Sequence, residues 1–138
     1  MEHKPYLTEL TENQIIIRNT IKDFAEKNIR PVIMEYDETQ KFPMEIMKQL
    51  GDLGFLGILV PEEFGGASLG YVEYALIIEE LSKIDPSIGL SVAAHNGLCT
   101  NHINLFGNDS QKKKYLPDLA SGKKIGAWGL TESASGSD

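Results

Sequence analysis

One stretch in the second half of the chain decides the fold, and it runs from Asp85 to Asn108 with the sequence DPSIGLSVAAHNGLCTNHINLFGN. From Pro86 onward this stretch contains no Lys, Arg, Asp or Glu. Asp followed by Pro is typical of a helix N-cap and first helical position, and Gly107 is a typical helix end. The pattern therefore predicts one long uncharged helix from Pro86 to about Phe106.

This helix is long enough to cross a bilayer, but its composition argues against a membrane location. It carries polar side chains that are costly to place in lipid, namely His95, Asn96, Asn101, His102 and Asn104 together with several hydroxyls. We therefore predict no membrane span and interpret the stretch as a central helix buried inside protein.

Amphipathic patterns on both sides of this stretch predict further helices. These helices are expected to start at Thr11, Pro43, Tyr71 and Asn108 or Asp109. Thr11 is expected to form a capping box with Gln14. After the first helix, a short apolar stripe continues from Pro31 to about Asp37. In the helix from Tyr71 to Lys83, the residues expected to face inward are Tyr71, Tyr74, Ala75, Ile78 and Leu81. The sequence therefore predicts an all-α helical bundle of about five or six helices.

After the last helix the pattern changes. Ile125-Gly126-Ala127-Trp128 is typical of the start of a strand, and residues 129–138 are rich in hydroxyls and glycine. Such a loop can cradle a phosphate group or the polar edge of a cofactor. It is neither a Walker A loop nor a dinucleotide-binding fingerprint, because the required spacings are absent. On composition alone, a polar tail is the other open interpretation.

Composition excludes some classes of function. The 138 residues include 13 Lys or Arg and 20 Asp or Glu, giving a net charge of −7. An acidic chain without a basic face is not expected to bind nucleic acid. Cys99 is the single cysteine, so no intrachain disulfide forms. No secretory signal is recognisable, and we expect a cytoplasmic location, or the mitochondrial matrix if the source is eukaryotic.

His95, Cys99 and His102 share one face of the predicted helix, because they lie at positions i, i+4 and i+7. All three residue types can bind zinc or copper, and a thiol beside an imidazole can act as a nucleophile. Metal sites usually draw ligands from more than one element, and residues one turn apart rarely align for attack. We favour buried or lining residues and predict no metal.

Three motifs, in order, resemble signatures of the flavin-dependent acyl-CoA dehydrogenase family. They are FLGILVPEEFGG at residues 55–66, FGNDSQKKKYLP at 106–117 followed by LASG at 119–122, and LTESASGSD at 130–138. The last is similar to the family's Thr-Glu-Pro-x-Ala-Gly-Ser-Asp motif. The resemblance begins at about Thr11 and covers nearly the whole chain.

The resemblance implies a domain organisation. Family members have an N-terminal helical domain, a middle β-domain and a C-terminal four-helix domain. Residues 1–124 would form the first, and residues 125–138 would begin the second with its first strand and the start of the flavin-site loop. The chain would then be the N-terminal part of a longer enzyme, cut off inside that loop.

The resemblance also implies an activity. The family uses FAD to oxidise an acyl-CoA thioester to its trans-2-enoyl product, and its electrons usually pass to an electron-transfer flavoprotein. Complete members often form homo-oligomers, either tetramers or dimers. The catalytic base lies in the C-terminal domain, and no residue here matches it, so the chain alone is expected to be inactive.

The motif match implies roles for individual residues. Trp128, Leu130 and Thr131 would lie along the flavin, with Thr131 bonding its pyrimidine edge. Gly136 and Ser137 would approach the FAD pyrophosphate, and Ser137 would also lie near the thioester. Leu90 and Ala94 would line the acyl pocket. Two departures from the family pattern are Ser133 in place of Pro, which makes the loop less rigid, and Ser135 in place of Ala.

Two further hypotheses compete with the flavoenzyme. One is a stand-alone helical interaction module that reuses the fold without chemistry. The other is a metal-binding helical protein, which would depend on His95, Cys99 and His102 alone.

Overall fold

The computed structural model describes residues 9–136 and is all-α, as predicted. Its helices are α1 (Glu12–Phe24), α2 (Ile33–Thr39), α3 (Met44–Asp52), α4 (Tyr71–Ile84), α5 (Pro86–Ala93), α6 (Asn101–Phe106) and α7 (Asp109–Ala120). π-helical turns at Ala25–Ile29 and Ala94–Thr100 extend α1 and join α5 to α6, and Glu62–Phe64 form a 3-10 turn. Because α5, its π turn and α6 form one uninterrupted helix, the described part contains six helices. This confirms the predicted bundle and its uncharged helix over 86–106.

The predicted helix starts are formed by the expected caps. Thr11 and Gln14 make a reciprocal capping box at the start of α1. Asp85 caps α5 by accepting a hydrogen bond of 2.8 Å from the Ile88 amide, and Pro86 follows as the first helical residue. Asn108 caps α7. These local side-chain to main-chain bonds explain why the boundaries are readable from the sequence.

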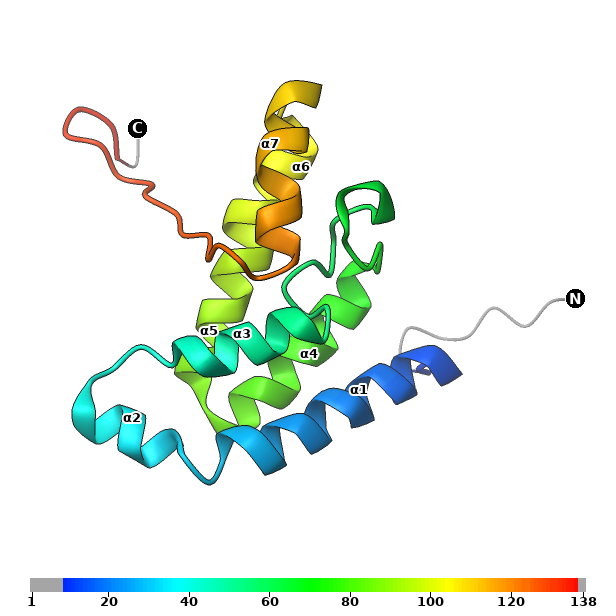
Figure 1. Ribbon diagram of the computed structural model, residues 1–138, viewed down its shortest axis with the longest axis vertical. Helices are drawn as coiled ribbons and strands as arrows, with labels where there is room; N and C mark the ends of the chain where they lie inside the picture. Colours follow the sequence, from blue (N-terminus) through cyan, green and yellow to red (C-terminus); the bar gives the residue numbers. More distant parts are fainter. Residues whose placement is uncertain (1–8, 137–138) are drawn as a thin grey trace, which may run out of the picture.

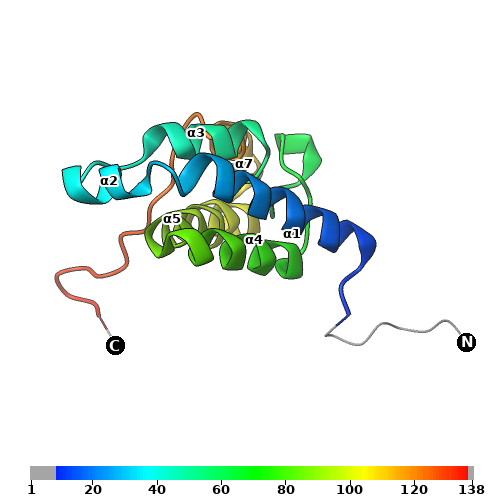
Figure 2. The same ribbon diagram turned by 90° about the horizontal axis from the view of Figure 1, so that it is seen from below.

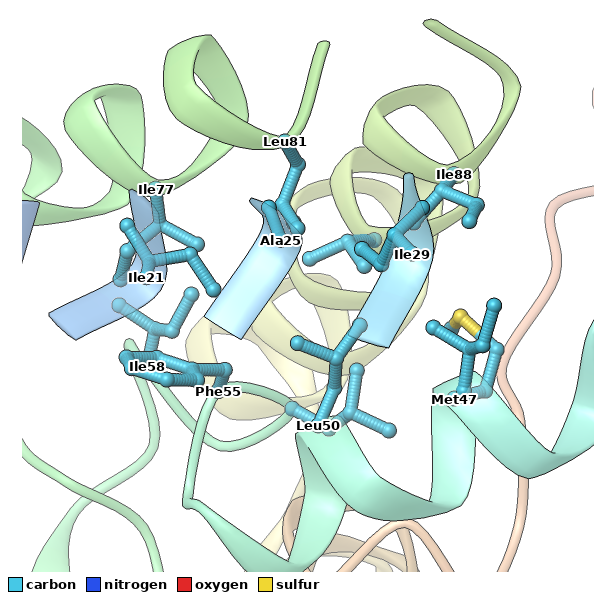
Figure 3. Packing of buried hydrophobic residues seen from close by; sticks show 13 residues of the cluster. Ile21, Ala25, Ile29, Met47, Leu50, Phe55, Ile58, Ile77, Leu81 and Ile88 are labelled. Carbon is cyan, nitrogen blue, oxygen red and sulfur yellow. The ribbon is translucent and has the colours of Figure 1, made fainter. Parts of the chain in front are cut away.

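The core lies where the long helices meet. α4 packs against both α1 and α5, and α6 packs against α7 (Figures 1 and 2). Figure 3 shows side chains from α1 and its π turn, α3, α4, α5 and the segment after α3 pointing toward one another. The fully buried members include Ile21, Ile29, Leu50, Ile77 and Leu81. Each such side chain contributes about 1.5–3 kcal/mol by leaving water.

A buried segment without regular structure, residues 55–60, lies between α3 and the 3-10 turn. The chain then folds back over it, so that Ala67, Ser68 and Leu69 donate main-chain hydrogen bonds to the carbonyls of residues 57, 60 and 58. Gly66 makes this return possible, because a Cβ there would lie 2.0 Å from the Val60 carbonyl oxygen. The glycine of the sequence motif is therefore needed for close approach of two main chains.

The residues expected to begin a strand, 125–128, have no regular secondary structure. A strand needs a partner strand for its hydrogen bonds, and the described residues contain none besides an isolated bridge between Glu132 and Ser135. Ile125 packs against the main core, and the chain then crosses the helix 86–106 and extends away from the bundle (Figure 1). None of the helices within residues 9–136 has the length and apolar character to span a membrane.

Candidate functional site

His95 lies at the centre of the candidate site and is fully buried. Its Nδ1 accepts a hydrogen bond of 2.9 Å from the Gly126 amide, and its Nε2 lies 3.0 Å from the Leu56 carbonyl oxygen. The Thr100 hydroxyl lies 3.4 Å from the same Nε2. Because an amide only donates and a carbonyl only accepts, these partners assign the neutral tautomer with its proton on Nε2. The ring thus joins residues 55–60 to the C-terminal part of the chain at Gly126.

The electrostatics of His95 favour this neutral form. Burial lowers the pKa of His95, because removing the imidazolium from water costs more than removing the neutral ring. The Leu56 and Leu119 carbonyls oppose this effect but are the smaller influences on the pKa. At neutral pH the ring therefore serves as one donor and one acceptor.

Cys99 packs directly against Gly126. A Cβ added at Gly126 would lie 2.6 Å from Cys99 Sγ and 2.7 Å from Cys99 Cβ, closer than real contacts allow. Burial also raises the pKa of the Cys99 thiol, an effect that the Ala127 backbone partly opposes. A nucleophilic thiol needs a lowered pKa, so the structure favours a packing role for Cys99.

His102 continues the same row toward the end of the helix. The Trp128 ring stands nearly perpendicular to the His102 ring, with centroids 4.5 Å apart and an interplanar angle of 74°. His95, Cys99 and His102, here called the docking row, therefore share one helix face, as predicted, and residues 126–128 lie along it. Within residues 9–136 no group of three or more His, Cys, Asp or Glu side chains is placed to hold a metal ion.

The residues expected to face the flavin lie at the end of this attached stretch or directly after it in the chain. Trp128 keeps 37% of its surface exposed and Leu130 keeps 75%, while Thr131 is exposed. An added Cβ at Gly136 would meet no atom within 4 Å. Ser137 lies outside the described residues. The described members thus present an apolar ring, an apolar side chain and a hydroxyl outward from one segment.

The residues expected to line an acyl pocket lie elsewhere on the helix 86–106. Leu90 is 69% exposed and Ala94 is half-buried. Leu90 lies in α5, whereas His102, which contacts Trp128, lies in α6 beyond the π turn. The structure therefore does not gather Leu90, Ala94 and Trp128 into one closed pocket. A depression of about 240 Å³ is lined by His102, which contacts Trp128, and by Ile103, Phe106, Gly107, Gln111 and Tyr115.

The helix 86–106 has an unusual distribution of polar residues. Part of its buried face is polar, with His95, Asn96 and Thr100. Its exposed apolar side chains are Leu90, Leu98, Leu105 and Phe106. Sequence reasoning missed the last three, although the uncharged composition of 86–108 was the signal that could have found them. A solvent-facing helix normally carries charges, so an uncharged exposed face indicates contact with a ligand or with more protein.

The sequence of this chain is similar to those of known proteins. The family model described as acyl-CoA dehydrogenase, N-terminal domain, matches residues 11–123. A short-chain-specific acyl-CoA dehydrogenase of Clostridium acetobutylicum is 44% identical over 129 residues, which are 94% of this chain and 34% of that protein.

Two solved structures are also similar. An acyl-CoA dehydrogenase complexed with FAD from Bacillus anthracis has a TM-score of 0.87 and 40% identity, over 97% of this chain and 23% of that one. A structure described as the electron transferring flavoprotein of Acidaminococcus fermentans has a TM-score of 0.88 and 40% identity, over 95% of this chain and 34% of that one.

The chain spans about a third of the length of the curated relatives that it matches. The matching family model covers most of the chain and includes all the helices and the docking row. The chain belongs to the acyl-CoA dehydrogenase family, within its N-terminal domain.

Proposed function

We propose that this chain supplies the helical domain and the first flavin-facing residues of an FAD-dependent acyl-CoA dehydrogenase. The whole protein would oxidise an acyl-CoA thioester to trans-2-enoyl-CoA and pass the electrons to an electron-transfer flavoprotein. The observation that carries the proposal is the segment 126–131, which leaves Trp128, Leu130 and Thr131 facing outward beside the docking row. Membership of the family supports the same assignment.

The chemistry of these side chains fits a flavin. The exposed ring of Trp128 and the side chain of Leu130 suit the apolar faces of an isoalloxazine, and the exposed Thr131 hydroxyl suits its polar pyrimidine edge. The open space at Gly136 suits close approach of a pyrophosphate. FAD, when bound, would supply the hydride acceptor. This chain's residues would fix the orientation of the acceptor and exclude water from one side.

The exposed apolar face of the helix 86–106 supports an acyl substrate as the neighbour of the same site. Leu90 and Ala94 would form one wall of a pocket whose other walls lie outside this chain. We propose that the catalytic carboxylate also lies outside it. The 138 residues alone are therefore expected to show no dehydrogenase activity. The complete protein is proposed to form a dimer or tetramer, and its location in the cytoplasm, or in a mitochondrial matrix, stays a prediction.

The test compares this chain with the product of the reading frame extended beyond residue 138. We expect the extended protein to bind FAD and to reduce an electron acceptor when given a short-chain acyl-CoA. We expect no such reduction by the 138-residue chain supplied with FAD. Activity of the short chain would contradict the assignment of the base. An extended protein without FAD or activity would favour the stand-alone interaction module instead.

A further inference from the structure

We propose that His95 is a positioning residue that holds the flavin-facing segment, residues 126–131, at a fixed place on the helical domain. Its imidazole bonds the Gly126 amide on one side and the Leu56 carbonyl on the other. The flavin-facing role of the segment depends on the function proposed above, whereas its attachment to His95 does not.

The segment has few other attachments. Its neighbours on the helix are Cys99, which packs against Gly126 and faces the Ala127 backbone, and His102, which contacts Trp128. Beyond Trp128, the side chains of Leu130 and Thr131 are exposed. The Gly126 bond is therefore the first point at which the main chain is fixed after it leaves the core at Ile125.

A histidine suits this role because it has two nitrogens on opposite sides of one rigid ring. The ring fixes the distance between residues 55–60 and the segment, and the neutral tautomer supplies the acceptor that Gly126 needs. Trp128 lies two residues after Gly126, so a displacement of Gly126 moves the side chains proposed to face the flavin.

Two substitutions separate the functions of the two nitrogens. In His95→Asn the amide oxygen takes the place of Nδ1 and can still accept from Gly126, but the bond to Leu56 is lost. In His95→Gln the amide nitrogen takes the place of Nε2 and can still donate to Leu56, but no acceptor faces Gly126. Both variants retain a neutral polar side chain of similar size. They differ in which partner they leave without a hydrogen bond.

The first measurement uses the unaltered 138-residue chain labelled with ¹⁵N. We expect the NMR spectrum to show a protonated Nε2 and an unprotonated Nδ1 for His95. We also expect the Gly126 amide to exchange with solvent at least roughly tenfold more slowly than the amide of Gly129, which is an exposed residue. The opposite tautomer, or equal exchange at the two glycines, would overturn the proposal without any variant.

The second measurement compares the two variants. Trp128 is the single tryptophan of the chain, so quenching of its fluorescence by acrylamide reports directly on the segment. In His95→Gln we expect the Gly126 amide to exchange roughly tenfold faster than in the unaltered chain, and acrylamide to quench Trp128 fluorescence more strongly. In His95→Asn we expect both the exchange rate and the quenching to stay near their original values. Equal effects of the two variants, or none in His95→Gln, would refute the role. If His95→Gln fails to fold, the tautomer and Gly126 exchange of the unaltered chain, together with the exchange and quenching of His95→Asn, still test the proposal.

None of these measurements uses FAD, so their outcome is independent of the proposed function. A docked segment in an extended protein that binds no FAD would refute the proposed function alone. If the extended protein binds FAD, we expect His95→Gln to weaken FAD binding more than His95→Asn does. Equal FAD affinity of the two variants would show that the attachment does not position the flavin-facing residues.

Discussion

Asn96 is expected to be the most important polar side chain for the stability of this domain. It is almost fully buried, and its side chain bonds three main-chain groups. Its Oδ1 accepts from the Ile58 amide at 3.2 Å, and its Nδ2 donates to the carbonyl oxygens of Phe55 at 3.0 Å and Val92 at 3.2 Å. Ile58 and Phe55 belong to the segment without regular structure, where no helix or sheet replaces these bonds.

The substitution Asn96→Ala would leave the Ile58 amide and the Phe55 carbonyl buried without partners. Each such group costs about 1–3 kcal/mol, so we expect the free energy of unfolding to fall by about 2–6 kcal/mol. That loss is a large share of the total of about 5–15 kcal/mol that is typical of a domain. The Val92 carbonyl adds little, because it lies within the helix and keeps access to a main-chain donor.

Urea unfolding followed by circular dichroism would measure this loss. Asn104→Ala is the matched control, because Asn104 makes one bond of 3.3 Å to the neighbouring Leu59 carbonyl and is only partly buried. We expect that control to lose about 0.5–1.5 kcal/mol. A loss of less than about 1 kcal/mol in Asn96→Ala, or no more than in Asn104→Ala, would refute the claim that Asn96 holds this segment.

Two other predictions concern the docking row. Gly126→Ala would place a Cβ 2.6 Å from Cys99 Sγ, so we expect the segment to leave the helix and Trp128 quenching by acrylamide to rise; Gly129→Ala, where space is open, should change neither, and unchanged quenching in Gly126→Ala would contradict the packing. For pH, the lowered pKa of His95 means that the stability contributed by its neutral form is complete above the unfolded-state value of 6.5 and is lost as pH falls toward the lower folded-state pKa. As pH falls from about 7.5 to about 5.5, the free energy of unfolding measured in urea should therefore decrease by up to about 1.4 kcal/mol per pH unit more in the unaltered chain than in His95→Asn. Parallel plots of this free energy against pH for the two proteins would argue against a neutral, buried His95.

The helix boundaries were predictable from the sequence because the signals that set them are local. The caps at Thr11, Asp85 and Asn108 each bond a main-chain group three residues away. The inward face of α4 was predicted less well: Tyr71 is 62% exposed and Ala75 is exposed, whereas Ile77 is fully buried. α4 packs between α1 and α5, so tertiary contacts, rather than the pattern along one helix, set the direction of its buried face.

The candidate site was only partly predictable, because its contacts join residues far apart in the sequence. The resemblance named Trp128 and Leu130 as flavin-facing residues, and that role stays a prediction; nothing in the sequence showed that Gly126 would lie against His95. That bond joins residues 31 positions apart, and the π turn over Ala94–Thr100 leaves no signal in the hydrophobic pattern. The expected strand start is absent from residues 125–128 because its formation needs a partner that the described residues lack.

The polar residues on the buried face of the helix 86–106 have a common use that explains their presence. Asn96 and Asn104 bond main-chain groups of residues 55–60, and His95 bonds both that segment and Gly126. Each replaces a hydrogen bond that a helix or sheet would otherwise supply to a buried main chain. This single helix therefore determines the course of two segments without regular structure, while its exposed residues are uncharged and mostly apolar. Substitutions on its buried face should change the geometry of the site, and substitutions at Leu90, which is proposed to line the acyl pocket, should change what that pocket recognises.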